Sequence, residues 1–247
     1  MPFERYIQTL MAVSILGLTP LEPSWSSRIP IVTVSTSGKA ISAIVDTGGI
    51  TESRKRSPRD FATYYSGLPI ELAIGVDYLR RHVVTIGKAA GPSQSVPLSV
   101  RTESHLTSAF VRCRLGRHSL LMLLDTAALA WRSADLAHSA PFAVVFLRPS
   151  QFQVLERNNI GSVSAIVQIA DEEGGFRLEP SITTSALICP NAGRAAAVTI
   201  VRRDDATTFL LLKRIYHLDI DGDVSLAASP GKAVAIDFPR QLMFIYE

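Results

Sequence analysis

Apolar and polar positions alternate along much of the chain with the period of two that is typical of β-strands. Val32 and Val34 alternate with polar residues in "IVTVST", whereas Ala43 to Val45 form a continuous apolar run. Alternation favours a half-exposed strand, and an uninterrupted run favours a buried one. Ser37-Gly38 predicts a turn between them. The sequence from Ile29 to Val45 therefore reads as strand, turn, strand.

The same pattern returns in the second half of the chain. The segment "SAFVRCRLGRHSLLMLLDTA" reads as strand, turn at Gly116-Arg117 and apolar strand, and it ends in Asp-Thr like the first. When Asp46 and Asp125 are aligned, Val32 falls on Val111 without a gap, and each valine lies 14 residues before its aspartate. Such a repeat predicts two copies of one supersecondary unit.

The rest of the chain is also expected to be rich in strands. One hairpin is predicted over 162–188 with its turn at 171–175, and a second is predicted to turn at Asp204-Asp205. Two strands around Pro239 close the chain, and 87–95 is the best candidate for a linker. Helix is expected only in short pieces, for which the candidates are 61–66, 78–82 and 133–138.

The candidate chemistry lies where each apolar strand ends in a carboxylate. A carboxylate at the end of a buried strand is costly unless it is hydrogen-bonded or neutralised. Two of them at the same place in two repeated units predict a pair that meets on a pseudo-twofold axis and shares one proton. Such a pair has one group to take a proton from water and another to protonate a substrate carbonyl. Small residues after Asp-Thr let backbone N–H groups approach the carboxylates.

These segments resemble the pepsin-like and retropepsin-like aspartic peptidases, in a diverged form of bacterial type. "AIVDTGG" at 43–49 is similar to the catalytic strand of that family, and "LLDTAAL" at 123–129 is similar to a second one. "LAIGVDYLRRHVVTI" at 72–86 resembles the glycine element that crosses behind the catalytic loop. "DGDVSLAASPGKAVAIDFPRQLMF" at 221–244 resembles its copy for the second half, with Gly222 as the best candidate for its glycine.

The resemblance implies an all-β, bilobed, aspartic-protease-like fold with a reduced N-terminal lobe. It implies catalysis by Asp46 and Asp125, and it needs no metal or cofactor. The residues of the supporting loops would be Thr47, Gly48, Thr126 and Ala127.

Three departures from the family pattern bear on activity. Ala127 stands where the family has glycine. Ile74 follows Asp46 by only 28 positions, which leaves little room for a flap hairpin in the first half. The hairpin around 163–180 is the alternative flap, although no tyrosine lies at its tip.

Each aspartate also has a plainer interpretation. Asp46 is placed to form a turn before Gly48-Gly49, and Asp125 is placed to cap a short helix running to Trp131. The aspartates at 219, 221 and 223 lack the glycine and the glutamate of a calcium-binding loop, so a calcium site is disfavoured.

Composition narrows the function classes. The charge is +3, from 25 basic and 22 acidic residues, and no long run of like charge suits nucleic acid. No spacing of Cys and His matches a metal site. Cys113 and Cys189 either form one bridge or are two buried thiols.

The first 28 residues are expected to be a signal peptide, an anchor or an N-terminal extension, because 6–18 are mostly apolar. Residues 29–95 and 96–247 are expected to form two aspartic-protease-like lobes. Export or a periplasmic location is the expectation, and a cytoplasmic one stays open. A membrane is expected as a partner only through an N-terminal anchor.

The sequence thus favours an aspartic endopeptidase that cuts peptide or protein substrates with a water activated between Asp46 and Asp125. The alternative is a relative that keeps the fold as a non-catalytic binding or structural protein. An unrelated β protein with a coincidental repeat is the third interpretation.

Overall fold

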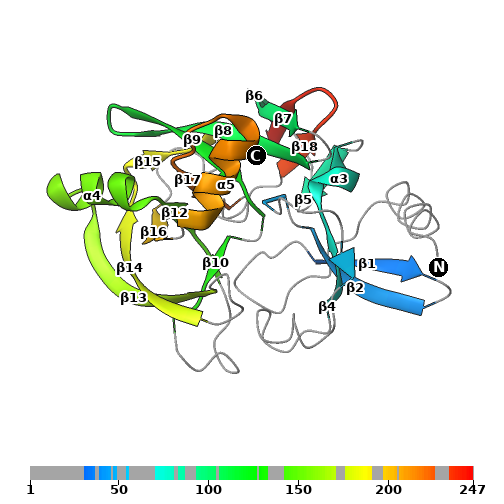
Figure 1. Ribbon diagram of the computed structural model, residues 1–247, viewed down its shortest axis with the longest axis horizontal. Helices are drawn as coiled ribbons and strands as arrows, with labels where there is room; N and C mark the ends of the chain where they lie inside the picture. The colour runs from blue at the N-terminus through cyan, green and yellow to red at the C-terminus, as the bar shows by residue number, and fades with distance from the viewer. Residues whose placement is uncertain are drawn as a thin grey trace.

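The computed structural model describes much of the chain after residue 30. The described residues are 31–36, 39–45, 47–48, 54–55, 70–80, 83–86, 93–103, 106–126, 128–132, 142–170, 176–190, 197–204, 206–225 and 234–246. They are mostly β-strands in four sheets, with a few helices (Figure 1). The prediction of a β architecture is therefore confirmed.

The first unit is a four-stranded sheet with the order β1-β2-β4-β3. Strands β1 and β2 are antiparallel, and β4 runs parallel to β2 because the chain crosses over before it returns. A short helix, α3, follows β4. The bounds are β1 Ile31–Thr36, β2 Lys39–Val45, β3 Arg54–Lys55, β4 Ile70–Ile74 and α3 Val76–Leu79.

The second unit is a larger sheet with the order β13-β14-β16-β12-β17-β9-β8-β15, and β7 also pairs with β8. Strand β17 lies between β9 and β12 and runs parallel to β9. The bounds are β7 Ser99–Glu103, β8 Leu106–Leu115, β9 His118–Leu124, β12 Val145–Leu147, β13 Ser162–Ala170, β14 Phe176–Thr184, β15 Leu187–Ile188, β16 Val198–Arg202 and β17 Gly222–Val224. A separate pair consists of β10 Leu129–Ala130 and β11 Phe142–Ala143.

The predicted repeat is confirmed by strand register. In the first unit Val32 lies opposite Ala43, and in the second Val111 lies opposite Met122, which are the same positions relative to Asp46 and Asp125. The crossing strand also matches. Ile74 pairs with Val45 in the first unit, and Val224 pairs with Leu124 in the second.

A third sheet joins the two units. Its order is β5-β18-β19-β6, with bounds β5 Val83–Ile86, β6 Ser93–Pro97, β18 Val234–Asp237 and β19 Leu242–Tyr246. The predicted closing strands around Pro239 are β18 and β19, and they lie between β5 and β6. Strand β6 begins at Ser93, inside the segment 87–95 that was predicted as a linker, because its residues pair with β19.

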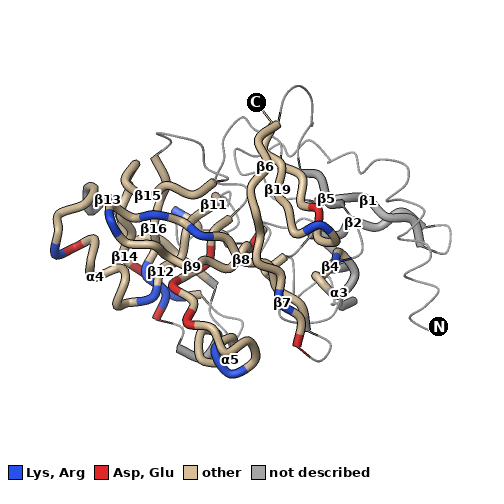
Figure 2. The backbone as a smooth tube through the Cα atoms, turned by 90° about the horizontal axis from the view of Figure 1, so that it is seen from above, with Lys and Arg blue, Asp and Glu red and all other residues tan. Residues whose placement is uncertain are grey.

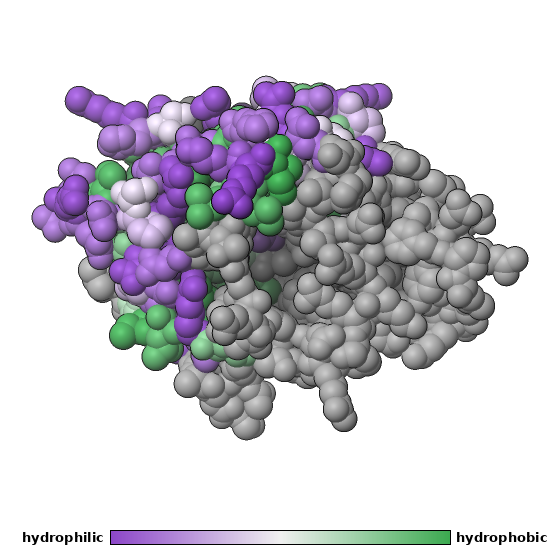
Figure 3. Space-filling view, viewed as in Figure 1, coloured by the Kyte–Doolittle hydropathy of each residue, from purple (hydrophilic) through white to green (hydrophobic). Residues whose placement is uncertain are grey.

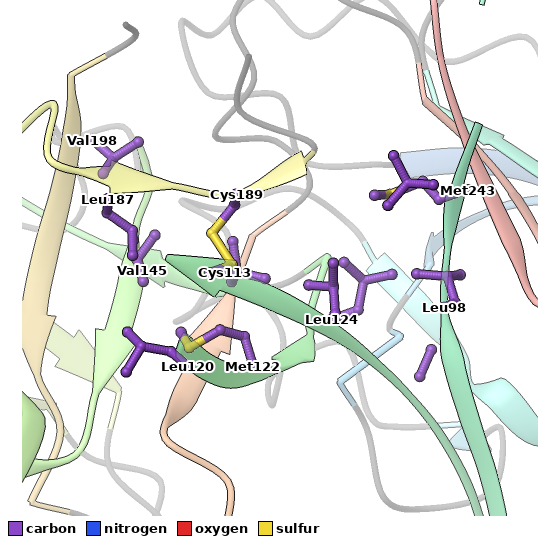
Figure 4. Close-up of a cluster of buried hydrophobic side chains, with 14 of the residues drawn as sticks. Leu98, Cys113, Leu120, Met122, Leu124, Val145, Leu187, Cys189, Val198 and Met243 are labelled. Carbon is purple, nitrogen blue, oxygen red and sulfur yellow. A yellow bond between two sulfur atoms is a disulfide. The ribbon is translucent and has the colours of Figure 1, made fainter. Parts of the chain in front are cut away.

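The main core lies beneath β8 and β9. Leu120, Met122 and Leu124 alternate inward along β9 and belong to one cluster of buried apolar side chains, which also includes Met243 of the joining sheet (Figure 4). A disulfide between Cys113 and Cys189, with Sγ atoms 2.04 Å apart, lies within this cluster. The structure therefore selects the bridged alternative for the two cysteines.

Among the described residues, two helices longer than eight residues interrupt the strands, α4 at Pro149–Arg157 and α5 at Ala206–Tyr216. The predicted hairpin turning at Asp204-Asp205 is wrong, because the chain enters α5 immediately after that turn. Phe209, Leu212 and Tyr216 recur at helical spacing and pack on Phe110 and Leu123 of the sheet. Within the described part of the chain, no helix has the length and apolar character needed to span a membrane.

A Cβ added to Gly222 would lie 2.0 Å from the backbone carbonyl oxygen of Phe146. The backbone of β12 cannot move aside as a flexible side chain can, so we expect Gly222→Ala to lower the free energy of unfolding by at least about 2 kcal/mol. Chemical denaturation measures the change. The control is Gly116→Asn in the β8–β9 turn, where an added Cβ meets nothing within 4 Å and φ is +58°, which asparagine tolerates. Equal effects of the two substitutions would contradict the tight packing of β17.

Candidate active site

Two buried threonines bind each other's loops directly after the two apolar strands. The backbone N–H of Thr47 donates to Oγ1 of Thr126 at 3.1 Å, and the backbone N–H of Thr126 donates to Oγ1 of Thr47 at 3.0 Å. Oγ1 of Thr47 in turn donates to the carbonyl oxygen of Leu124 at 2.8 Å. Both threonines are fully buried. The two Asp-Thr segments, 79 residues apart in sequence, are therefore locked together.

Gly48 lies against the carboxyl group of Asp125. A Cβ added to Gly48 would be 2.2 Å from Cγ and 2.5 Å from Oδ1 of Asp125, so any larger residue would displace that carboxylate. Both residues are only partly buried, and the carboxylate is thus held at the edge of the packed core rather than inside it. The backbone N–H of Asp125 donates to the carbonyl oxygen of Val224 on β17 at 3.0 Å.

The crossing strands lie beside both loops in matching registers. Because Ile74 pairs with Val45 and Val224 pairs with Leu124, the residues that follow them, Gly75 and Ser225, occupy equivalent places. Both are buried. The expectation that Gly222 is the glycine of the second element is therefore wrong: Ser225 occupies that place. Gly222 is required for a different close contact, with the backbone of β12.

The structure brings Thr47, Gly48, Asp125 and Thr126 together, as the repeat predicts. Asp46 and Ala127 lie outside the described residues. The helix-cap interpretation of Asp125 is wrong, because Leu129–Ala130 is a β-strand and Trp131 forms a β-bridge. Sequence reasoning missed Ser225, since only the register of β17 on β9 reveals its place.

The long hairpin of β13 and β14 is tied to the chain a few residues after Asp125. The backbones of Trp131 and Gln168 exchange two hydrogen bonds of 2.8 Å, and the Trp131 ring meets that of Phe176 edge-on with centroids 5.3 Å apart. Trp131 is almost fully buried, so it is a packing residue. The predicted hairpin over 162–188 is confirmed, and the tip at 171–175 lies outside the described residues. Its exposed face carries Ile166 and Leu178.

A buried ion cluster ties β14 to β16. Glu179 is only 5% exposed and lies 3.1 Å from Nε of Arg177 and 3.5 Å from Nη2 of Arg202. Burial raises the pKa of Glu179, and the neighbouring Asp204 acts in the same direction, while the two arginines act against it. The ionised form is therefore held at a cost in the middle of the hairpin, opposite Val167.

The aspartates around β17 serve structural contacts. Asp219 pairs with Lys213 at 2.8 Å. Asp223 pairs with Arg203 at 2.7 Å. Asp221 accepts hydrogen bonds from the backbone N–H of Leu121, from the Arg148 side chain and from the Gln151 side chain. Across the described ranges, no group of three or more His, Cys, Asp or Glu is arranged to hold a metal ion.

A mostly β fold with two Asp-Thr loops locked together is thus the class of structure that the geometry defines. No protein-family model matches the sequence, and no curated protein matches it. Among solved structures, the chain is similar to conglutin gamma, a basic 7S globulin from lupine seeds, with 13% identity and a TM-score of 0.30 over 63% of this chain and 40% of that one. It is also similar to the aspartic proteinase from Irpex lacteus, with 11% identity and a TM-score of 0.30 over 64% of this chain and 48% of that one. The chain thus covers less than half of either protein.

We expect Thr126→Val to lower the free energy of unfolding by about 1–3 kcal/mol, because the buried N–H of Thr47 loses its acceptor. Valine keeps the shape of the side chain and removes only the oxygen. The control is Ser119→Ala on β9, where an exposed serine loses its hydroxyl. Denaturant titration should show a change of less than about 0.5 kcal/mol there. If the two variants unfold alike, the threonine lock does not stabilise the fold.

We expect the stability of Glu179→Gln relative to the wild type to rise with pH. The pKa of Glu179 in the folded protein is raised above its ordinary value of 4.5. The carboxyl group therefore stabilises the folded state fully when the pH is below 4.5, and this stabilisation is lost as the pH rises through the pKa of the folded protein. Glutamine does not titrate, so the difference in melting temperature should grow between about pH 4 and pH 7. A difference that does not vary with pH would contradict the burial cost.

Proposed function

We propose that the chain is an aspartic-type endopeptidase in which Asp46 and Asp125 activate a water molecule. The observation that carries the proposal is the reciprocal bonding of Thr47 and Thr126. Each threonine directly follows one of the two aspartates, so the lock constrains where both carboxylates start. Gly48, packed on the Asp125 carboxylate, adds a second contact between the two loops.

The chemistry follows from two carboxylates that share one proton. The ionised carboxylate takes a proton from water as the water attacks the carbonyl carbon of the peptide bond. The protonated one donates its proton to the carbonyl oxygen, which gives a neutral gem-diol intermediate. Collapse of this intermediate transfers a proton to the leaving nitrogen and restores the shared state. The partial exposure of Asp125 is consistent with access for a substrate.

The hairpin of β13 and β14 is the best candidate for a flap over the substrate. Its anchor at Trp131 is six residues from Asp125, and its outer face carries the exposed side chains of Ile166 and Leu178. Apolar side chains on a hairpin near a peptide site suit contacts with apolar substrate residues.

One observation favours the alternative of a non-catalytic relative that binds through the same fold. Ser225 occupies the place of Gly75 in the second unit, and Ala127 follows the second Asp-Thr. Both add side-chain atoms where the first unit has glycine. If these atoms widen the second loop, binding would persist without cleavage.

We expect cleavage of an unfolded protein substrate at acidic pH, inhibited by a statine-type compound. The shared-proton state exists only between the two apparent pKa values of the pair. Asp125→Asn should lower the rate at least about 100-fold, because an amide is neither base nor proton donor. Cleavage products are measured by gel and mass spectrometry between about pH 3 and 7.

The matched control is Asp219→Asn, an aspartate whose side chain is 62% exposed, far along the chain from the Asp-Thr loops. Its rate should equal that of the wild type. Ala127→Gly should keep or raise the rate if the enzyme tolerates its altered loop. A folded protein without inhibitor-sensitive cleavage at any pH, in the wild type and in Ala127→Gly alike, would favour the non-catalytic alternative.

A further inference from the structure

A groove lies where β6 diverges from β8 to join another sheet. Strands β6 and β7 are one extended segment interrupted at Leu98, whose N–H donates to the carbonyl oxygen of Gln241. Strand β7 pairs with β8 as far as Ser99 opposite Phe110, and β6 then pairs with β19 instead. The groove between the diverging strands has a volume of about 510 Å³. Its lining residues are Gln94, Ser95, Val96, Pro97, Arg112, Cys113, Arg114, Arg117, Ser119, Ile188 and Pro190.

The edge of β8 beside this groove has a gap in its strand pairing. Pairing with β7 ends at Phe110, and pairing with β15 starts at Arg114, where Ile188 lies opposite. Between these two points, residues 111–113 pair with β9 on the inner side, and no described strand pairs with them on the outer side. An edge of this kind is able to accept an added strand.

The backbone of Arg112 faces that outer side. Leu121 lies opposite Arg112 on β9, and its N–H donates to the Asp221 carboxylate at 2.9 Å while its carbonyl oxygen accepts from the Asp221 N–H at 2.8 Å. Leu121 thus directs its peptide groups away from β8. In an antiparallel ladder its partner must then do the same on the other edge. Arg112 therefore presents one donor and one acceptor toward the groove.

The groove is basic. Three of its lining residues are arginines, Arg112, Arg114 and Arg117, and none is Asp or Glu. None of the three arginines forms an ion pair with a carboxylate of the described residues. The surface over the β8–β9 hairpin is hydrophilic, at the upper left in Figure 3, and Figure 2 marks the basic positions along the backbone. The charge of the groove is thus available to a ligand.

We propose that this groove binds an acidic peptide segment in extended conformation, added to the free edge of β8. Side chains two residues apart on a strand leave the same face about 7 Å apart, which is also the spacing of alternate residues in an extended peptide. Only Arg112 lies at the unpaired part of the edge, because Ile188 lies opposite Arg114. The backbone of the segment would therefore pair with Arg112, and its acidic residues would face the guanidinium groups of Arg112 and Arg114. Guanidinium groups bind carboxylates through paired hydrogen bonds.

Two further features favour a peptide. None of the described residues that line the groove is aromatic, so these residues provide no stacking platform of the kind that single-stranded nucleic acid uses. The Cys113–Cys189 disulfide joins the floor of the groove to the segment after β15. A site that is already ordered loses less conformational entropy when a ligand binds. Ile188, which is 38% exposed, and two prolines supply apolar contacts beside the charges. None of these residues belongs to the Asp-Thr loops, so the proposal stands whether or not the chain cuts peptides.

The test is binding of a blocked, fluorescent octapeptide of alternating Glu and Val to the full oxidised chain near neutral pH, at about 50 mM salt, where screening is weak. We expect the affinity to fall with added salt, and a Lys-Val peptide not to bind. Replacing Arg112, Arg114 and Arg117 together by Gln should weaken binding at least about tenfold, since exposed charge pairs contribute singly little. Arg101→Gln, on the exposed part of β7, is the control and should change the affinity less than about twofold.

A second measurement separates strand addition from simple attraction of charge. Alternate N–H groups of an extended peptide point to opposite edges, so methylating every second backbone nitrogen blocks hydrogen bonding along one edge only. The affinity should fall when the odd-numbered or the even-numbered nitrogens are methylated, but not in both cases. Equal binding by the wild type and the triple variant, or no binding at millimolar peptide, would overturn the proposal. Displacement by an equal concentration of inorganic phosphate, or indifference to methylation, would overturn the assignment to a peptide and indicate an anion site only.

Discussion

The reciprocal hydrogen bonds between Thr47 and Thr126 are the constraint on which the arrangement of the two units depends. Both threonines are buried, and the N–H of each donates to the side chain of the other. An unpaired buried N–H is costly, and movement of either loop would leave the N–H groups of both threonines unpaired. The lock also joins the strand ends directly, because Thr47 donates to the last carbonyl of β9. Two sheets of different size are thus held in one relative position at their strand ends.

The crossing strands maintain the loops from behind. In each unit the strand that precedes the aspartate has an antiparallel partner on one side and a parallel one on the other, so its end is fixed from both edges. The first crossing strand ends 28 residues after Asp46, and the second ends 99 residues after Asp125. The additional length of the second unit contains α4, α5, the long hairpin and the buried ion pairs that tie them to the sheet. The same local motif therefore tolerates very different insertions.

How much the sequence could predict depends on whether a feature is local. The strand, turn, strand pattern and the alignment of the two valines follow from period-two alternation, and the observed registers agree with them. Helix α5 was missed because "FLLL" is a continuous apolar run, which suits a buried strand as well as a helix. The cysteine pairing and the place of Ser225 depend on strands that are close in space but far apart in sequence. Composition contains no information on such contacts.

The joining sheet explains how a small first unit is integrated with a large second one. Strand β5 follows the first crossing strand and β6 precedes β7, yet neither pairs with the other, because β18 and β19 from the C-terminal end lie between them. The strands β18 and β19 thus complete a sheet that begins with β5, the strand that follows the first unit. The same topology creates the basic groove. Since β6 must leave β8 to reach β19, the edge of β8 loses its neighbour at Val111–Cys113. A sheet edge there is a consequence of joining the units, and three arginines with no acidic residue beside them give that edge a chemical preference.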